Sequence, residues 1–281
     1  METSTPSEQN SLHLNTALVR EVLVRFLRDQ TTNADFAKVV IGISGGVDSA
    51  LVAALAVDAL GKENVFGVMM PHRSSNPKSL EDAASVVAWL GIRSQTIDIS
   101  PMADVYCEAN NVGDQLRRGN VMARTRMTVL YDLSARERAL VIGTSNKTEL
   151  LMGYGTQFGD LACALNPLGD LYKTQVWQLA EAMGIPEAIV RKKPSADLWE
   201  GQTDEGEMGF AYAELDPLLF QMIDQRRSDE ELVKSGFAME FVGKVKERVR
   251  KNQFKRRPPV IAKISYRTVN VDFRYVRDWD I

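Results

Sequence analysis

The sequence predicts an α/β protein: a doubly wound parallel sheet with helices on both faces, followed by a helical C-terminal part. Short apolar runs alternate with segments in which apolar residues recur at helical spacing. One run, 39–43, breaks at Ser44-Gly45-Gly46 directly before a helical pattern, which indicates a strand, a glycine turn and a helix. From Leu215 onward the apolar spacing is helical. Repeated strand–helix units are typical of parallel sheets covered by helices.

The elements follow in order along the chain. Residues 1–10 are polar and predict a disordered tail, and apolar residues at helical spacing from Leu12 to Arg28 predict a first helix. The predicted strands are 39–43, 65–70, 94–99 and 140–143. The predicted helices between them are 49–60, 79–90 and about 115–136. Because the carboxyl ends of parallel strands share one edge, the residues after them should cluster there: Ser44, Pro71, Ser100 and Thr144.

Two segments, Pro71–Lys78 and Pro194–Gly209, interrupt this pattern with Pro, Ser, Asn and Gly. Long loops inside a compact domain are often lids over a site, with plain disorder as the alternative. We expect one domain over 11–257. The remaining residues, 258–281, are too few for a domain and form a C-terminal extension.

Composition limits the class of protein. The chain has 281 residues, of which 44% are hydrophobic, enough for a substantial core. The net charge of −3 argues against a general nucleic-acid-binding protein. The polar N-terminus lacks an apolar leader, and the longest apolar stretch, 50–60, is too short to span a membrane. Cys107 and Cys163 are far apart and predict no disulfide framework. We expect a cytoplasmic protein with no membrane or nucleic-acid partner.

The glycine turn has the features of an anion-binding loop. Gly45 and Gly46 let backbone N–H groups approach an anion, and the following helix adds its N-terminal partial charge. Ser44 and Ser49 add hydroxyl groups, whereas Asp48 suits a phosphate loop only when a cation is also present. No Gly-Lys-Ser/Thr follows, so this is not a Walker A motif, and it does not fit GxGxxG. The alternative is a tight strand–helix turn with an incidental Asp.

Other charged residues could serve the same site. Arg124 and Arg126 lie on the predicted 115–136 helix, and arginine suits phosphate or carboxylate, with a surface ion pair as the alternative. Glu149 follows the strand at 140–143 and could share a metal with Asp48. Two carboxylates without nearby histidines favour Mg²⁺ over zinc. Alone, Glu149 would be an ordinary helix residue.

The motifs together resemble a known family. The SGGVDS loop resembles the pyrophosphate loop of the ATP pyrophosphatases. With ARTRM, GTSNKTE, NPLGDLYKTQ, GIPEAI and KPSADLW in this order, the chain resembles the ammonia-dependent NAD synthetases over about residues 15–257. The loop alone indicates only the superfamily, whereas the motifs around Lys173 and Ser195 indicate the branch. The resemblance implies an adenine-nucleotide alpha-hydrolase-like fold.

The resemblance also implies an activity and its residues. The family is a group of ligases that adenylate the nicotinate carboxylate of deamido-NAD with ATP, release pyrophosphate, and let ammonia displace AMP to give NAD. Asp48 and Lys173 would act in catalysis, and Asp48 and Glu149 would bind Mg²⁺. Deamido-NAD would be held by Arg124, Gln157, Asp160 and Lys255, the last usually from the other subunit of a homodimer. ATP would be held by Gly42, Ile43, Ser44, Gly45, Gly46, Val47, Asp48, Ser49, Thr144, Lys173 and Ser195.

The chain departs from the family pattern on one side of the site. Gln157, Ala164 and Phe254 stand where many members have Lys, Asp and His, and all three map to the dinucleotide side. Either the dinucleotide is held differently here or the carboxylate substrate differs. Ser195 replaces a more usual Thr and keeps the hydroxyl. Residues 1–38 are too few for an amidotransferase module, so we expect free ammonia as the nitrogen donor.

Two other readings stay open. An ATP pyrophosphatase for sulfur transfer or tRNA modification would tend to carry a reactive cysteine or a CxxC pair, and Cys163 has no such partner. A non-catalytic nucleotide-binding module could use the same scaffold. For the homodimer that the family implies, the first helix and the 115–136 helix are the expected interface, although their apolar stripes could equally face the core.

Overall fold

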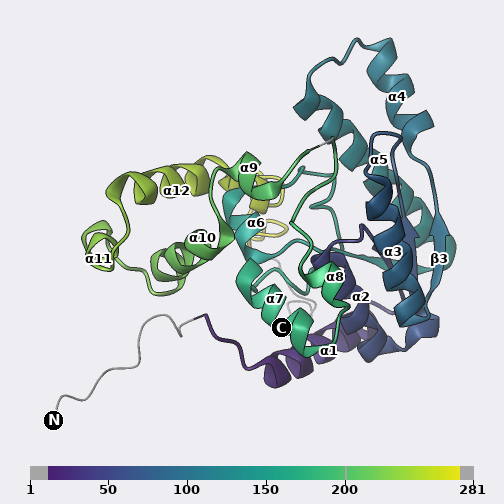
Figure 1. Ribbon diagram of the computed structural model, residues 1–281, viewed down its shortest axis with the longest axis horizontal. Coiled ribbons are helices and arrows are strands. Elements are labelled where there is room, and N and C mark those ends of the chain that lie inside the picture. Colours follow the sequence, from purple (N-terminus) through teal and green to yellow (C-terminus); the bar gives the residue numbers. More distant parts are fainter. Residues whose placement is uncertain (1–11, 200, 273–281) are drawn as a thin grey trace.

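A four-stranded parallel sheet forms the centre of the computed structural model, which describes residues 12–199 and 201–272 (Figure 1). The strand order is β3-β2-β1-β4, and every neighbouring pair is parallel. The strands are β1 (Lys38–Gly42), β2 (Val65–Met69), β3 (Arg93–Thr96) and β4 (Ala139–Ile142). All four predicted strands are therefore present, and β3 ends three residues earlier than expected.

Helices cover both faces of the sheet, as a doubly wound fold requires. The apolar side chains of Val39 and Ile41 belong to one core with five helices, and Val40 belongs to a second core with two. On the first face lie α1 (Thr16–Asn33), α2 (Val47–Leu60), α3 (Pro77–Leu90), α7 (Lys173–Ala182) and α8 (Glu187–Val190). On the other lie α4 (Ser100–Ala109) and α5 (Gln115–Glu137). The alternation of side chains along β1 produces the two cores.

Helix α4 was not expected from the sequence. The Asp98 carboxylate accepts hydrogen bonds from the Ser100 backbone N–H at 2.8 Å and from the Ser100 hydroxyl at 2.6 Å, and Pro101 occupies the first turn. The Asp98 side chain thus pairs with the first residue of the helix, and the fixed φ of Pro101 favours the first helical turn. The predicted strand at 94–99 was therefore too long at its C-terminal end, because the chain already turns toward α4 there.

The C-terminal part is helical, as predicted, and it has its own core. Leu215, Leu219, Val242 and Val245 are all fully buried there. Trp177 of α7 packs against both this core and the first sheet core, which joins the two. Figure 1 shows α10, α11 and α12 extending to one side of the sheet layers. The elements are α6 (Lys147–Met152), α9 (Asp204–Met208), α10 (Tyr212–Leu219), a π-helical turn (Phe220–Asp224), α11 (Asp229–Lys234) and α12 (Met239–Lys251).

Two of the predicted segments are at the ends of the chain. The predicted tail at 1–10 lies outside the described residues, and so does part of the extension, 273–281. Residues 258–272 contain no helix and add no strand to the sheet. Within 12–199 and 201–272, no helix is long and apolar enough to cross a membrane. The single domain over 11–257 stays a prediction.

Candidate active site

A cavity of about 590 Å³ lies at the carboxyl edge of the strands. Of the four residues expected there, Ser44, Pro71 and Thr144 line it. Ser100 does not line it, because its hydroxyl instead accepts the Arg73 N–H at 2.8 Å and anchors the 71–76 segment. From the set expected to hold ATP, the cavity is lined by Gly42, Ile43, Ser44, Gly46, Val47, Asp48, Ser49, Thr144, Lys173 and Ser195.

The loop after β1 requires glycine. Gly45 has a φ of +76°, and a Cβ there would stand 2.4 Å from the Ser79 carbonyl oxygen and 2.9 Å from the Ala83 nitrogen. Gly46 caps α2 without any side-chain hydrogen bond to the first turn. The first N–H groups of α2 therefore have no side-chain cap at the cavity wall, which is the arrangement that binds phosphate at helix N-termini.

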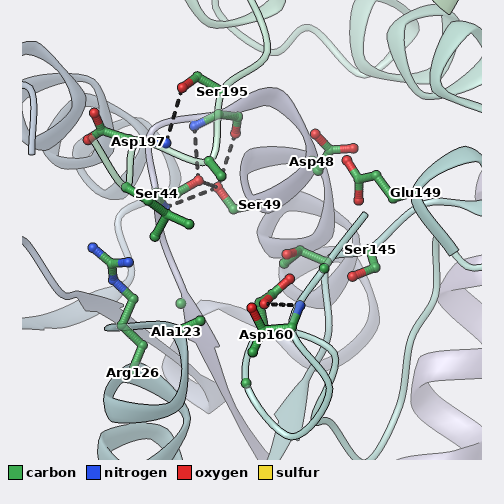
Figure 2. A pocket seen from close by; sticks show the side chains of 18 of the residues that line it. Ser44, Asp48, Ser49, Ala123, Arg126, Ser145, Glu149, Asp160, Ser195 and Asp197 are labelled. Carbon is green, nitrogen blue, oxygen red and sulfur yellow. Dashed lines mark hydrogen bonds between the residues drawn. The ribbon is translucent and has the colours of Figure 1, made fainter. Parts of the chain in front are cut away.

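Two serines hold the shape of this loop (Figure 2). The hydroxyls of Ser44 and Ser49 are 3.1 Å apart, and the Ser49 hydroxyl donates to the Gly46 carbonyl at 3.0 Å. The Ser44 backbone N–H donates to the Ser49 oxygen at 3.2 Å. These bonds tie the end of β1 to the start of α2, so the loop is organised by its own side chains.

A lysine and two carboxylates meet beside the loop. The Lys173 side chain is 1% exposed, and its ammonium donates to Asp48 and lies 4.0 Å from Glu149 Oε1. Asn146 Nδ2 donates to the other Asp48 oxygen at 3.0 Å. Burial would lower the pKa of Lys173, but the charges of Asp48 and Glu149 raise it above its ordinary value. The lysine therefore stays protonated and links the two carboxylates.

The same carboxylates fit a divalent cation. Burial, and then the charge of Asp48, raises the pKa of Glu149 well above its ordinary value. Two acidic groups so close together are stabilised by positive charge between them, and here the Lys173 ammonium supplies it. Carboxylate oxygens are ligands that Mg²⁺ accepts, with phosphate oxygens and water completing its shell. Asp48 and Glu149 are therefore the residues of this cluster that could hold Mg²⁺.

A buried aspartate supports this cluster from behind. Asp216 of α10 is 0% exposed and accepts from the Thr148 hydroxyl at 2.7 Å and from the Thr174 N–H at 2.8 Å. The Thr148 oxygen in turn accepts the Lys173 backbone N–H at 3.0 Å. Asp216 thereby joins the start of α7, which carries Lys173, to α6, which carries Glu149. No motif in the sequence pointed to it.

A second missed carboxylate lies in the segment predicted as a lid. Asp204 begins α9, is 5% exposed, and accepts from Tyr154 Oη at 2.9 Å and Tyr212 Oη at 3.3 Å. Burial raises its pKa, and the charge of Lys173 opposes that shift. The Arg248 guanidinium donates to the Met208 carbonyl at 3.0 Å at the other end of α9. These contacts hold the lid helix against the cavity.

The residues expected to hold the dinucleotide separate into two groups. Asp160 and Lys255 line the cavity of their own chain. Asp160 accepts the Thr156 N–H at 2.8 Å, and burial raises its pKa although one side of the carboxylate faces the cavity. The Lys255 ammonium donates to the carbonyls of Gly153 and Gly155 at 2.7 and 2.9 Å.

The other two expected residues do not line the cavity. Arg124 is exposed and donates through Nε to the Gln157 carbonyl at 3.3 Å. Arg126, two positions along α5, does line the cavity and donates to the Met70 carbonyl at 3.0 Å (Figure 2). Successive turns of a helix bring residues three and four apart to the same face, so neighbours two apart point in different directions.

Comparison with known proteins agrees with this architecture. A family model described as NAD synthase matches residues 19–259. A protein of Trichlorobacter lovleyi named NH(3)-dependent NAD(+) synthetase is 56% identical over 268 residues, covering 95% of this chain and 98% of that one. A Fusobacterium nucleatum protein of the same name is 52% identical over 255 residues, covering 91% and 99%.

Solved structures are similar over nearly the same length. An NH3-dependent NAD synthetase from Campylobacter jejuni, in complex with the nitrate ion, has a TM-score of 0.77 and 37% identity, covering 89% of this chain and 100% of that one. An NMN synthetase from Francisella tularensis has a TM-score of 0.79 and 32% identity with the same coverage. With the family model matching most of its length, the chain belongs to the NAD synthase family.

Proposed function

We propose that this protein is an ammonia-dependent NAD synthetase that converts deamido-NAD to NAD. A carboxylate oxygen of the nicotinate group attacks the α-phosphorus of ATP, the bond to the bridging oxygen breaks, and pyrophosphate leaves. Ammonia then attacks the acyl carbon of the adenylated nicotinate, and AMP leaves with the electrons of the acyl–oxygen bond. A proton passes to solvent, and the amide of NAD remains.

One observation carries the proposal. The buried Lys173 ammonium, with Asp48 and Glu149 around it, borders the same cavity as the glycine loop after β1. Attack on phosphorus needs neutralisation of phosphate charge more than removal of a proton, and this cluster supplies fixed charge. A protein that only bound nucleotide would have no need for a buried lysine shared by two carboxylates.

Each group has a definite task in this reaction. The N–H groups at the start of α2 and the hydroxyls of Ser44 and Ser49 hold the triphosphate. Lys173 offsets the charge that develops as pyrophosphate leaves. Asp48 and Glu149 would hold Mg²⁺, which when bound adds positive charge against the phosphate oxygens. We expect the predicted lids, 71–78 and 194–209, to exclude water, which would hydrolyse the adenylated intermediate. Pro71, Ser195 and Gln202 of these segments line the cavity.

The dinucleotide site extends between two subunits of a homodimer in this proposal. Arg124 faces solvent rather than its own cavity, so a dinucleotide that it holds must reach beyond that cavity. The two helices expected at the interface carry exposed apolar side chains: Leu18 and Val22 of α1 are 55% and 56% exposed, and Tyr131 of α5 is 41% exposed. Light scattering should return about twice the 31.3 kDa chain mass, and a monomer mass would contradict the dimer.

The assay that tests the function contains ATP, Mg²⁺, ammonium and deamido-NAD, and follows NAD and AMP. NAD formed one-for-one with AMP, and lost in Glu149→Ala, is the expected result. Nicotinate mononucleotide serves as a second acceptor, because one similar solved structure is described as an NMN synthetase. Release of AMP with nicotinate mononucleotide but not with deamido-NAD would make the mononucleotide the substrate. The departures at Gln157, Ala164 and Phe254 on the dinucleotide side would then reflect that different substrate.

Ammonia is the proposed nitrogen donor, and the proposed place of action is the cytoplasm. Replacing ammonium by glutamine in the same assay, with no partner protein present, should abolish NAD formation. Equal turnover with glutamine would contradict the ammonia requirement. A Cys163→Ala variant should keep full activity, whereas its complete loss would favour sulfur-transfer chemistry.

A further inference from the structure

A second lysine, Lys192, lies two residues before Pro194 and contacts the glycine loop after β1. The Lys192 ammonium lies 2.8 Å from Asp82 Oδ2, 3.2 Å from Ser79 Oγ and 3.4 Å from the Gly45 carbonyl oxygen. Its side chain is 26% exposed, and it lines the cavity together with Ser79. None of the reaction steps above uses this lysine.

The carboxylate that holds Lys192 is itself built into α3. The Asp82 side chain is 8% exposed and also pairs with Lys78 at 3.1 Å. Burial would raise the pKa of Asp82, but hydrogen bonds from Lys192 and Lys78 lower it below its ordinary value. Asp82 is therefore charged, and it keeps the Lys192 ammonium beside the loop while leaving part of it open to the cavity.

The two lysines differ in how much of their charge is already used. Lys173 is enclosed and shared between Asp48 and Glu149. Lys192 pairs with Asp82, which it shares with Lys78, and Lys78 also pairs with Glu81 at 3.4 Å. The Lys192 ammonium next to Gly45 is therefore less fully neutralised than that of Lys173, which lies between two carboxylates. Pyrophosphate carries several negative charges, and ammonium groups form strong charge-assisted hydrogen bonds to phosphate oxygens. The Ser79 hydroxyl, which also lines the cavity, is a further donor at the same point.

We propose that Lys192 is a phosphate-binding catalytic residue, which contacts the terminal phosphates of ATP and the pyrophosphate that leaves. When the phosphates bind, its ammonium keeps Asp82 as one partner and exchanges the Gly45 carbonyl for phosphate oxygens. The role rests on the proposed function for its place in catalysis, but the binding of pyrophosphate can be measured without any turnover. The competing explanation is a purely structural tether between α3, the loop and the segment after α8.

The test is calorimetric titration of inorganic pyrophosphate, with Mg²⁺ present, into the native protein and three variants. Lys192→Met removes the charge at similar length and should weaken pyrophosphate binding about tenfold, the scale of one lost charge-assisted contact. Asp82→Asn keeps a side-chain oxygen that can accept from Lys192 but removes a negative charge near the ligand, so binding should stay equal or become tighter. Lys78→Met is the matched control, because it removes the other lysine that pairs with Asp82. The Lys78 side chain is 66% exposed and does not line the cavity, so this variant should change binding less than twofold.

The signs separate the two explanations. A tether predicts that Lys192→Met and Asp82→Asn weaken binding together, because either variant breaks the same link. That result, an unchanged Lys192→Met, or no measurable pyrophosphate binding by the native protein would overturn the proposal. If Lys192→Met does not fold, as judged by thermal unfolding, Lys192→Gln takes its place. Failure of the NAD assay with weakened pyrophosphate binding in Lys192→Met would reject the proposed reaction while keeping this site.

Discussion

The Asn76 backbone N–H donates to both carboxylate oxygens of Asp197, at 3.1 and 3.2 Å. This contact joins the two segments that the sequence predicted as lids. The Ser75 hydroxyl adds a bond of 3.5 Å to the Asp197 carbonyl. Asp197 reaches this position with a φ of +50°, a left-handed conformation that is unfavourable for most residues. A strained residue at a contact between two loops indicates that the contact itself determines the local conformation.

Breaking this contact should open the lids. Asp197→Ala removes both acceptor oxygens, so we expect a several-fold higher KM for ATP and faster proteolytic cleavage within 194–209. Asp197→Asn is the control, because asparagine keeps one acceptor oxygen and tolerates the left-handed conformation. Cleavage of both variants at the native rate would show that the contact does not hold the lids.

The loop glycine can be tested against a matched position. Gly45→Ala places a Cβ 2.4 Å from the Ser79 carbonyl and should abolish ATP binding by shifting the loop. Gly184 also has a positive φ, +70°, but nothing lies within 4 Å of a Cβ there. Gly184→Ala therefore shows the cost of the backbone conformation alone, about 1 kcal/mol, and should keep activity. Equal loss of ATP binding in both would mean that strain, not the clash, disables the loop.

The support behind Lys173 should affect rate as well as stability. Thr148→Val removes the hydroxyl that joins Asp216 to the Lys173 N–H, and leaving such groups unpaired costs about 1–3 kcal/mol of unfolding free energy. We expect kcat to fall about tenfold, a change of about 1.4 kcal/mol in the barrier, with KM little changed, because Lys173 is displaced. Thr148→Ser keeps the hydroxyl and should restore the rate.

These measurements are made well below the unfolding temperature of each variant, so that only folded protein contributes to kcat. A native kcat in a destabilised Thr148→Val protein would restrict this hydrogen-bonded chain to a structural role.

Glu149 should set the requirement for Mg²⁺. Glu149→Gln keeps the shape of the side chain but removes its charge, so the Mg²⁺ concentration for half-maximal activity should rise at least about tenfold. Glu187→Gln, on the exposed surface of α8, is the control for loss of one carboxylate. An unchanged Mg²⁺ requirement in Glu149→Gln would remove this residue from the predicted metal site.

Much of the site was predictable because its signals are local. The strand, glycine turn and helix around Ser44-Gly45-Gly46 are encoded within a dozen residues, and the motifs around Lys173 and Ser195 are equally short. Arg124 and Arg126 show the limit of prediction from local sequence. Both are arginines in one motif, and which one lines the cavity depends on how α5 packs against the sheet.

The sequence by itself determined the α/β class, the succession of strands and helices along the chain and the glycine loop, because periodicity and turn chemistry act between near neighbours. The charged residues expected around that loop, such as Lys173, followed from the resemblance of short motifs to a known family. Only the tertiary structure decided that Asp216 supports Lys173, that Asp204 faces the same cluster, and that Lys192 stands on Asp82 beside Gly45. Each of these contacts joins segments far apart in the chain. Their formation depends on which helix faces meet when the cores close, and no local pattern records that choice.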